Sequence, residues 1–446
     1  MRVHNSHVLS LGWKPIIPFL FWLSSCSDRI MLKQACTAMS RSSLALSNLR
    51  AAAILIVLAF HSCIAYLNFL PSSPQPFNSP PYQWRSFPII DSQRWFGFDL
   101  FCAPQDVYLM SLMFFMSGVF VWPSLSRKGS WGYTRDRVLR LGVPFGLAVF
   151  LLMPIAYYPV YLVTATDPSV AAFSQSYLAL PFWPSGPPWF LWQLLVLNLA
   201  AAGIHRFAPG WQTLLARTAS VGAHPGRFFA GLVAASALAY VPLAIAFTPW
   251  EWSQLGPFGL QLSRPLHYAV YFFAGIAVGI YGIENGLLAP DGLLARRWAM
   301  WLMAAFLAFL LWITPTALIF EHRDAARLGL QFSADLGFVL SCACSSFFLL
   351  AVFLHFARNR SRALDNLSRN AYGIYLVHYV FVVWLQYALL NAPLFAFAKA
   401  AIVFGVTLVL SWVGSAALGR LPLHSLKGGT AAKQPMPGIK ANVIDL

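Results

Sequence analysis

The sequence contains few charged residues: Asp, Glu, Lys and Arg make up 10% of its 446 residues, whereas apolar and aromatic residues make up 59%. Soluble globular proteins contain about 25% charged residues, because their surfaces face water. The shortage of charge therefore excludes a soluble enzyme, a disordered tail protein and a secreted module held by disulfides. A composition this apolar is typical of one domain that crosses a membrane many times.

Acidic residues are less frequent than basic residues: the sequence has 14 Asp and Glu and 30 Lys and Arg. None of the acidic residues lies in the middle of a predicted span, which argues against the carboxylate proton relay of a pump. The six cysteines show no ligand spacing, so we expect neither a metal site nor a structural disulfide. We expect no nucleic-acid partner either, because the basic residues form short clusters between apolar runs.

Apolar stretches of bilayer length recur along the chain. A helix needs about 20 apolar residues to cross the hydrocarbon core, and these runs do not alternate with period two as barrel strands do. We therefore predict an all-α, polytopic membrane protein of about ten transmembrane helices. The predicted bounds are 48–70, 106–124, 141–163, 187–205, 227–247, 266–283, 298–319, 334–356, 370–390 and 395–418.

The distribution of Lys and Arg predicts the orientation of these helices. With the N-terminus inside, the inner segments hold 24 of the 30 basic residues and the outer loops hold five. Because basic residues are retained on the cytoplasmic side, both termini are predicted to be cytoplasmic.

Three regions follow from this pattern. Residues 1–43 form an N-terminal extension, 44–420 the membrane domain and 421–446 a disordered cytoplasmic tail. Within the extension, residues 14–26 resemble a short signal sequence with a lipoprotein-type cleavage site. A misassigned start, with Met31 or Met39 as the true first residue, explains the same stretch, and both interpretations stay open.

Two histidines, His61 and His378, lie inside apolar runs, where an ionisable side chain is costly and suggests a functional site. Arg50 precedes His61 by 11 residues, so on a helix both side chains project from one face, about 16 Å apart along the axis. A basic side chain at the cytoplasmic end of the span, with a titratable side chain deeper in the membrane, favours the binding of an anionic ligand. Alternatively, Arg50 snorkels to lipid headgroups and His61 bonds a neighbouring helix.

Two further pairs carry weaker signals. Arg137 and Arg140 share a helix face and suit bidentate binding of phosphates, although basic residues also flank spans for orientation alone. Trp189 and Trp192 suit stacking on sugar rings, although aromatic residues commonly gather at the membrane interface.

Taken in order, the motifs resemble the acyltransferase-3 family of integral-membrane O-acyltransferases over residues 44–418. Their form is most similar to the branch of glucan biosynthesis protein C, a glucan succinyl transferase. The motifs are Asn48-Leu-Arg50 with His61, Phe114-Phe-Met-Ser-Gly118, Arg137-x-x-Arg140 before Pro144, Trp189-Phe-Leu-Trp192, and Ser368-Arg-Asn-Ala-Tyr-Gly-Ile-Tyr-Leu-Val-His378.

The resemblance implies a multi-pass protein of the inner (plasma) membrane that moves an acetyl- or succinyl-type group from cytoplasmic acyl-CoA to a hydroxyl of a carbohydrate or glycan. Acyl-CoA is then a co-substrate, and no permanently bound cofactor is expected. His61 is the expected general base or covalent acyl carrier, and His378 positions it or a substrate. Arg50, Arg137 and Arg140 are expected to hold the donor's phosphates, and Trp189 and Trp192 the acceptor's sugar rings.

Two other classes of function remain. A transporter would move a glycan or lipid-linked sugar without acyl chemistry, although no inverted repeat is visible in the sequence. If the protein were a structural or regulatory membrane subunit, the placement of Arg50 and His61 on one helix face would have no functional role.

Overall fold

The computed structural model describes residues 40–208, 210–220, 224–321 and 328–418. Within these ranges the chain is helical apart from one short hairpin, which confirms the predicted all-α class. Nine described helical segments are long and apolar enough to cross a membrane, or ten if a pair bent by 87° counts as one span. Most of the predicted extension (1–43) and the whole predicted tail (421–446) lie outside the described residues.

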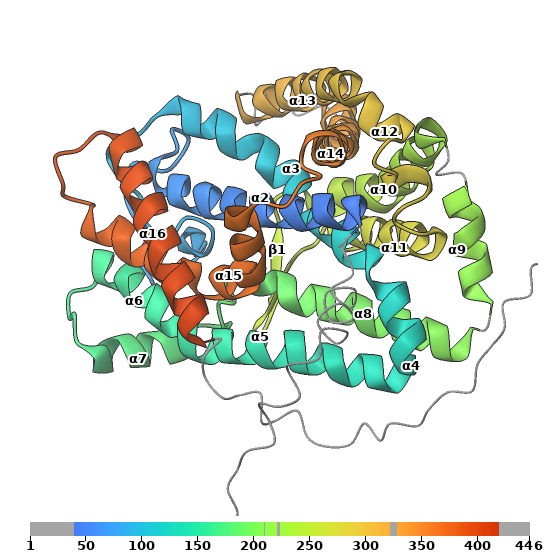
Figure 1. Ribbon diagram of the computed structural model, residues 1–446. Helices are drawn as coiled ribbons and strands as arrows, with labels where there is room; N and C mark the ends of the chain where they lie inside the picture. The colour runs from blue at the N-terminus through green and yellow to red at the C-terminus, as the bar shows by residue number, and fades with distance from the viewer. Residues whose placement is uncertain (1–39, 209, 221–223, 322–327, 419–446) are drawn as a thin grey trace, which may run out of the picture.

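Figure 1 labels the elements. The α-helices are α2 (Arg41–Cys63), α3 (Phe96–Val119), α4 (Val121–Arg137), α5 (Val143–Leu147), α6 (Met153–Thr164), α7 (Val170–Leu178), α8 (Trp189–Phe207), α9 (Trp211–Ser220), α10 (Pro225–Phe247), α11 (Pro265–Tyr281), α12 (Leu293–Arg296), α13 (Trp298–Glu321), α14 (Leu328–Phe356), α15 (Arg362–Ala388) and α16 (Ala396–Leu418). The two strands, β1 (Trp252–Leu255) and β2 (Phe258–Gln261), pair antiparallel between α10 and α11.

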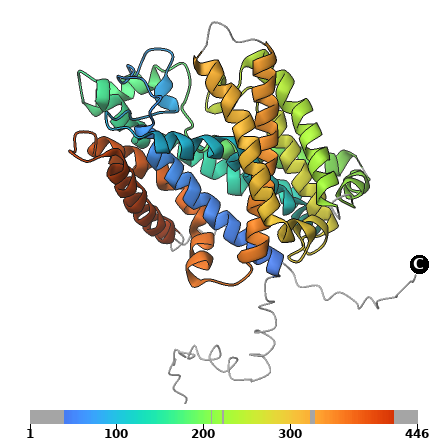
Figure 2. The same cartoon turned by 90° about the horizontal axis from the view of Figure 1, so that it is seen from above.

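Helix α2 runs through the middle of the molecule, as Figures 1 and 2 show, and contacts α3, α14, α15 and α16. Two hydrogen bonds join it to α15: the Ser47 and Ser368 hydroxyls lie 2.7 Å apart, and Gln386 Nε2 donates to the His61 carbonyl oxygen at 2.8 Å. Since the first bond lies near the start of both helices and the second near the end of both, α2 and α15 run parallel. Helix α13 packs on α14 and exposes many large apolar side chains, as a lipid-facing helix does.

Helices α3 and α11 approach each other at three glycines. A Cβ added to Gly118 would overlap the Phe272 carbonyl oxygen, and one added to Gly275 would overlap that of Phe115. Gly279 meets the Val119 carbonyl in the same way. Small residues let membrane helices pack backbone against backbone, so these three glycines serve packing here.

Replacing Gly275 by alanine should destabilise the folded protein by about 1–3 kcal/mol, the usual cost of overpacking a close contact. The matched control is Gly231→Ala in α10, where an added Cβ meets no atom within 4 Å. Alanine there should leave stability unchanged or raise it slightly, because it favours the helix. Thermal unfolding of the two purified variants measures the difference, and equal melting temperatures would contradict the close approach.

Several helix ends differ from the predicted bounds. The first helix begins at Arg41 rather than at 48, because Ser40 caps it: its hydroxyl oxygen accepts from the Ser43 amide at 3.2 Å. The second begins at Phe96 rather than at 106 and continues through Pro104. A prediction from hydropathy alone ends a helix at polar residues and prolines. The observed helix continues past them where neighbouring helices satisfy the hydrogen bonds of its backbone.

The interval between the predicted spans 106–124 and 141–163 is helical as well, because residues Val121–Thr164 form a continuous helical segment. It bends at Gly129, whose φ of 68° falls in the left-handed region, and contains π-helical turns at Val138–Gly142 and Ala148–Leu152. Its prolines cannot donate to the carbonyl four residues before them. The Tyr372 hydroxyl donates to the freed Arg140 carbonyl at 2.7 Å, four residues before Pro144. Trp384 Nε1 donates to the Ile155 carbonyl at 2.9 Å, four residues before Pro159.

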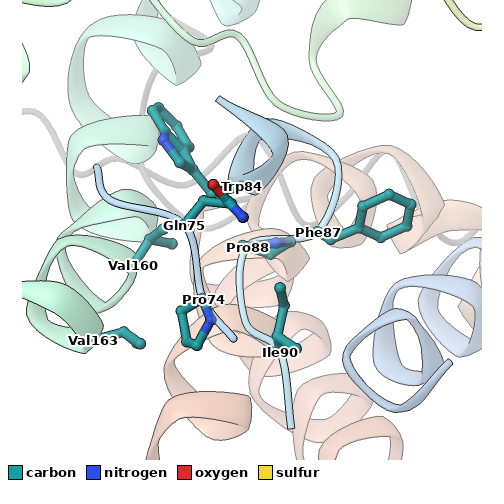
Figure 3. Close-up of a pocket in the computed structure, with 8 residues that line it drawn as sticks. All are labelled: Pro74, Gln75, Trp84, Phe87, Pro88, Ile90, Val160 and Val163. Atoms are coloured by element: carbon teal, nitrogen blue, oxygen red, sulfur yellow. The ribbon is translucent and has the colours of Figure 1, made fainter. Parts of the chain in front are cut away.

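The connection between α2 and α3 folds over the adjacent helix ends. Arg94 donates to the carbonyls of Leu70 and Pro71, and Trp84 Nε1 donates to the Phe77 carbonyl at 3.0 Å. Figure 3 shows a small cavity where this connection meets Val160 and Val163 of α6. Its volume of about 10 Å³ is at the limit for one water molecule, so we do not regard it as a substrate site.

Candidate active site

The structure brings the two predicted histidines together. His61 lies third from the end of α2 and His378 near the middle of α15, and their ring centroids are 5.1 Å apart at an interplanar angle of 61°. Their meeting follows from the parallel packing of the two helices. His61 lies closer to its helix end than predicted, but residues 62–67 beyond it are all buried.

Hydrogen bonds to backbone carbonyls assign the tautomer of both rings. His61 Nδ1 lies 2.9 Å from the Val57 carbonyl oxygen, and His378 Nδ1 lies 2.6 Å from that of Tyr375. A carbonyl oxygen only accepts, so each Nδ1 carries the hydrogen and each Nε2 presents a lone pair. His378 is 0% exposed, and its Nε2 is buried without a hydrogen-bond partner among the described residues. The site therefore holds two imidazoles with their acceptor nitrogens available.

Neighbouring side chains fix this pair in place. Gln386, also 0% exposed, holds the His61 backbone, and its own Oε1 has no described partner. The Tyr375 hydroxyl donates to the Pro187 carbonyl just before α8, one turn from His378 on α15. The Tyr379 ring lies edge-on to His61 at 5.5 Å. Sequence reasoning did not single out Gln386, because one glutamine near the end of an apolar helix has no pattern that distinguishes it.

Arg50 lies on the same helix as His61, as predicted, but further from the helix start. Because α2 begins at Arg41, Arg50 is about two and a half turns into it rather than at its mouth. Its guanidinium carbon lies 5.5 Å from the centroid of the Phe120 ring. None of the ion pairs found among the described residues includes Arg50, so its charge is available to an anionic ligand.

Arg137 and Arg140 lie at the junction of α4 and the π-helical turn and have different surroundings. Arg140 pairs with Asp136 at 2.8 Å, and Lys128 pairs with the same carboxylate at 2.9 Å. The guanidinium carbon of Arg137 lies 4.7 Å from the centroid of the Tyr133 ring, and its Nε has no described partner. Arg137 is thus the less neutralised of the two.

Trp189 and Trp192 lie in the first turn of α8 and pack on the hairpin. The Trp189 ring is stacked with Tyr268 at 6.0 Å and lies edge-on to Trp252 at 5.9 Å. Trp192 Nε1 donates to the Gly259 carbonyl at 3.1 Å. Both indoles are partly exposed, so contact with a sugar remains a prediction.

Sequence reasoning also missed a buried ion pair between α16 and the α2–α3 connection. Lys399 Nζ of α16 lies 2.7 Å from Asp91 Oδ2 in the α2–α3 connection, and the two side chains are 1% and 0% exposed. Lys399 also donates to the Leu390 carbonyl at 3.1 Å. A lysine among apolar residues was a visible signal, but nothing in the sequence identified a partner 308 residues away.

Comparison with known proteins identifies the family. A family model described as an acyltransferase domain (Acyl_transf_3) matches residues 43–416, which include every predicted site residue. No curated protein and no solved structure matches the chain. The chain therefore belongs to the acyltransferase-3 family and is a multi-pass membrane acyltransferase.

Proposed function

We propose that this acyltransferase transfers an acetyl- or succinyl-type group from cytoplasmic acyl-CoA to a hydroxyl of a carbohydrate or glycan. The similarity of its motifs to the glucan succinyl transferase branch supports a glucan-type acceptor. Acyl-CoA acts as a co-substrate, and the reaction requires no permanently bound cofactor.

The observation that carries this proposal is the His61–His378 pair, in which each Nε2 presents a lone pair. A sugar hydroxyl is a weak nucleophile at neutral pH, and a neutral imidazole within reach removes its proton as it attacks. The hydroxyl oxygen then bonds to the thioester carbonyl carbon, the carbon–sulfur bond breaks, and the thiolate of coenzyme A leaves. The proton held by the imidazole passes to that thiolate, which restores the neutral ring.

A covalent route uses the same nitrogen. His61 Nε2 attacks the thioester carbonyl, the thiolate leaves, and the acyl group is held on the imidazole. The acceptor hydroxyl then attacks this acyl-imidazole, its proton passes to water and so balances the charge of the released thiolate, and His61 Nε2 regains its lone pair. His378 Nε2 has no partner among the described residues, so we propose that it accepts a hydrogen bond from the reacting hydroxyl in the covalent route and from a neighbouring hydroxyl of the acceptor in the base route.

Arg50, Arg137 and Arg140 are the proposed contacts of the donor's phosphates. Arg137 has a free Nε and no carboxylate partner among the ion pairs of the described residues, whereas Arg140 already pairs with Asp136. Trp189 and Trp192 are proposed to contact sugar rings of the acceptor from the start of α8.

Replacing Arg137 by alanine should raise the KM for acyl-CoA roughly tenfold or more, because one hydrogen bond to a charged group contributes about 1.5–3 kcal/mol. Arg140→Ala should have a smaller effect, since Asp136 already neutralises much of its charge. Lys128→Ala is the matched control: it removes a basic residue that pairs with the same carboxylate, and should leave KM nearly unchanged. Equal KM increases in all three variants would indicate a general effect of positive charge instead of a donor contact.

Mass spectrometry of cell-surface and periplasmic glycans tests the proposed activity. A deletion strain should lack an acyl ester that wild-type protein restores, and the ester's mass identifies both the group and the acceptor. An unchanged ester profile, with glycans accumulating on one side of the membrane, would instead support a transporter.

A further inference from the structure

A second cavity, with a volume of about 200 Å³, is lined by residues of α3, α10, α13 and α14 and of the segment between α10 and α11. None of the residues that line it belongs to α2 or α15, so it is separate from the histidine pair. It lies near the starts of α11 and α14 and the ends of α10 and α13, the side that the charge pattern predicts to face outward. His61, near the end of α2, is predicted to lie toward the same side.

A buried carboxyl group lines this cavity without a partner. Asp335 is 1% exposed, and its Oδ2 has no hydrogen-bond partner among the described residues. The nearby guanidinium of Arg264, 4% exposed, is engaged elsewhere: its two terminal nitrogens donate to the Asp106 carboxylate at 3.1 and 2.6 Å. Burying a polar group without a hydrogen bond costs free energy. We therefore expect a ligand or a water molecule to donate a hydrogen bond to Asp335.

The side chains that line the cavity offer no free positive charge to an anionic ligand. Asp106 and Asp335 carry acidic groups, and Arg264 supplies one positive charge that Asp106 already balances. A phosphate of coenzyme A or of a lipid headgroup would find no free cation here to offset its loss of hydration, because Arg264 already pairs with Asp106. A neutral ligand that is rich in hydroxyl groups fits, because each hydroxyl can both donate and accept a hydrogen bond.

The walls and the size of the cavity favour a sugar ring among such ligands. Trp250, Trp312 and Tyr240 line it, and flat aromatic side chains offer apolar faces alongside polar tips. The volume of about 200 Å³ is many times the roughly 10–15 Å³ that one water molecule needs. It is below the roughly 300–1,000 Å³ of sites for drug-sized ligands, so it suits one ring rather than a chain of rings.

We propose that this cavity binds one saccharide unit, with a sugar hydroxyl donating to Asp335 and the ring lying against Trp250 or Trp312. The inference rests on the proposed function, because the occupant is a non-reacting unit of the glycan acceptor. Binding energy from a part of the substrate remote from the reacting hydroxyl then helps to orient that hydroxyl.

Saturation-transfer NMR tests the site directly. The full-length protein is placed in lipid nanodiscs without sugar-based detergent and mixed with methyl glucoside, methyl galactoside or methyl mannoside. Wild type should transfer saturation to at least one of them, and Asp335→Ala should weaken its apparent affinity by about two- to tenfold, the effect of losing one buried hydrogen bond. Trp250→Ala, at a partly exposed indole, should also weaken binding and keeps the test valid if Asp335→Ala fails to fold.

The control is His355→Asn, near the end of α14, which should bind the sugar as wild type does, since His355 neither lines the cavity nor contacts the histidine pair. Transfer to none of the three sugars, transfer unchanged in both cavity variants, or displacement of the sugar by inorganic phosphate would overturn the proposal. The readout needs no acyl donor, so its failure is distinguishable from the absence of an acyl ester in cells.

Discussion

Replacing His61 by asparagine should abolish acyl transfer while leaving the fold intact. The asparagine amide nitrogen can take over the hydrogen bond that His61 Nδ1 gives to the Val57 carbonyl, but nothing replaces Nε2. Loss of a general base lowers rates by about 10²–10⁴-fold, and loss of a covalent acyl carrier lowers them further. The measurement is acyl transfer by purified protein from radiolabelled acyl-CoA, together with the melting temperature of each variant.

His355→Asn is the matched control for this experiment. His355 lies near the end of α14, where its ring contacts Trp298 and Phe356 instead of the histidine pair. This variant should keep wild-type activity. Full activity in His61→Asn would remove His61 from the mechanism. A stable label on wild-type protein in the absence of acceptor, missing from His61→Asn, would assign the covalent route.

Breaking the Asp91–Lys399 ion pair should have the largest effect on stability. Both side chains are almost fully buried, so removing one charge leaves the other without a partner at a site that water does not reach. Such a loss typically costs about 3–5 kcal/mol. Asp91→Asn is the sharper single variant, because its side-chain oxygen can still accept from the Gln93 amide, as Asp91 Oδ1 does at 2.8 Å. A large fall in the melting temperature of purified protein is the expected result.

The double variant Asp91→Asn with Lys399→Met separates the charge effect from packing. Methionine fills much of the volume of the lysine stem and needs no counter-charge, so the double variant should recover most of the lost stability. The contrary result is a double variant that loses as much stability as Asp91→Asn and Lys399→Met lose in sum. In that case the two side chains are not coupled, and the assignment of a stabilising pair is wrong.

Hydropathy predicted the number of helices because each membrane crossing needs its own run of apolar residues. It did not predict where α2 and α3 begin, because Ser40 capping and continuation through Pro104 do not depend on apolar character. It also left residues 125–140 outside any predicted span, although Val121–Thr164 is helical, because charged residues end an apolar run whether or not the helix continues.

The candidate site was predictable only in part. His61 and His378 stand out because ionisable residues are rare inside apolar runs, but their apposition depends on α2 and α15 lying side by side. The difference between Arg137 and Arg140 depends on which of them Asp136 reaches. A partner that is distant in the chain, such as Asp91 for Lys399, becomes visible only when the tertiary structure is known.

The prolines of the 121–164 segment fix the spacing between two contacts on α15. Tyr372 and Trp384 reach the carbonyls that Pro144 and Pro159 leave free, so two attachment points 12 residues apart on α15 must match two on the other helix. One inserted residue between them would rotate everything beyond it by about 100° and advance it by about 1.5 Å. His378 lies between the two points, so the chain can vary the length of its loops but not that of this helical interval.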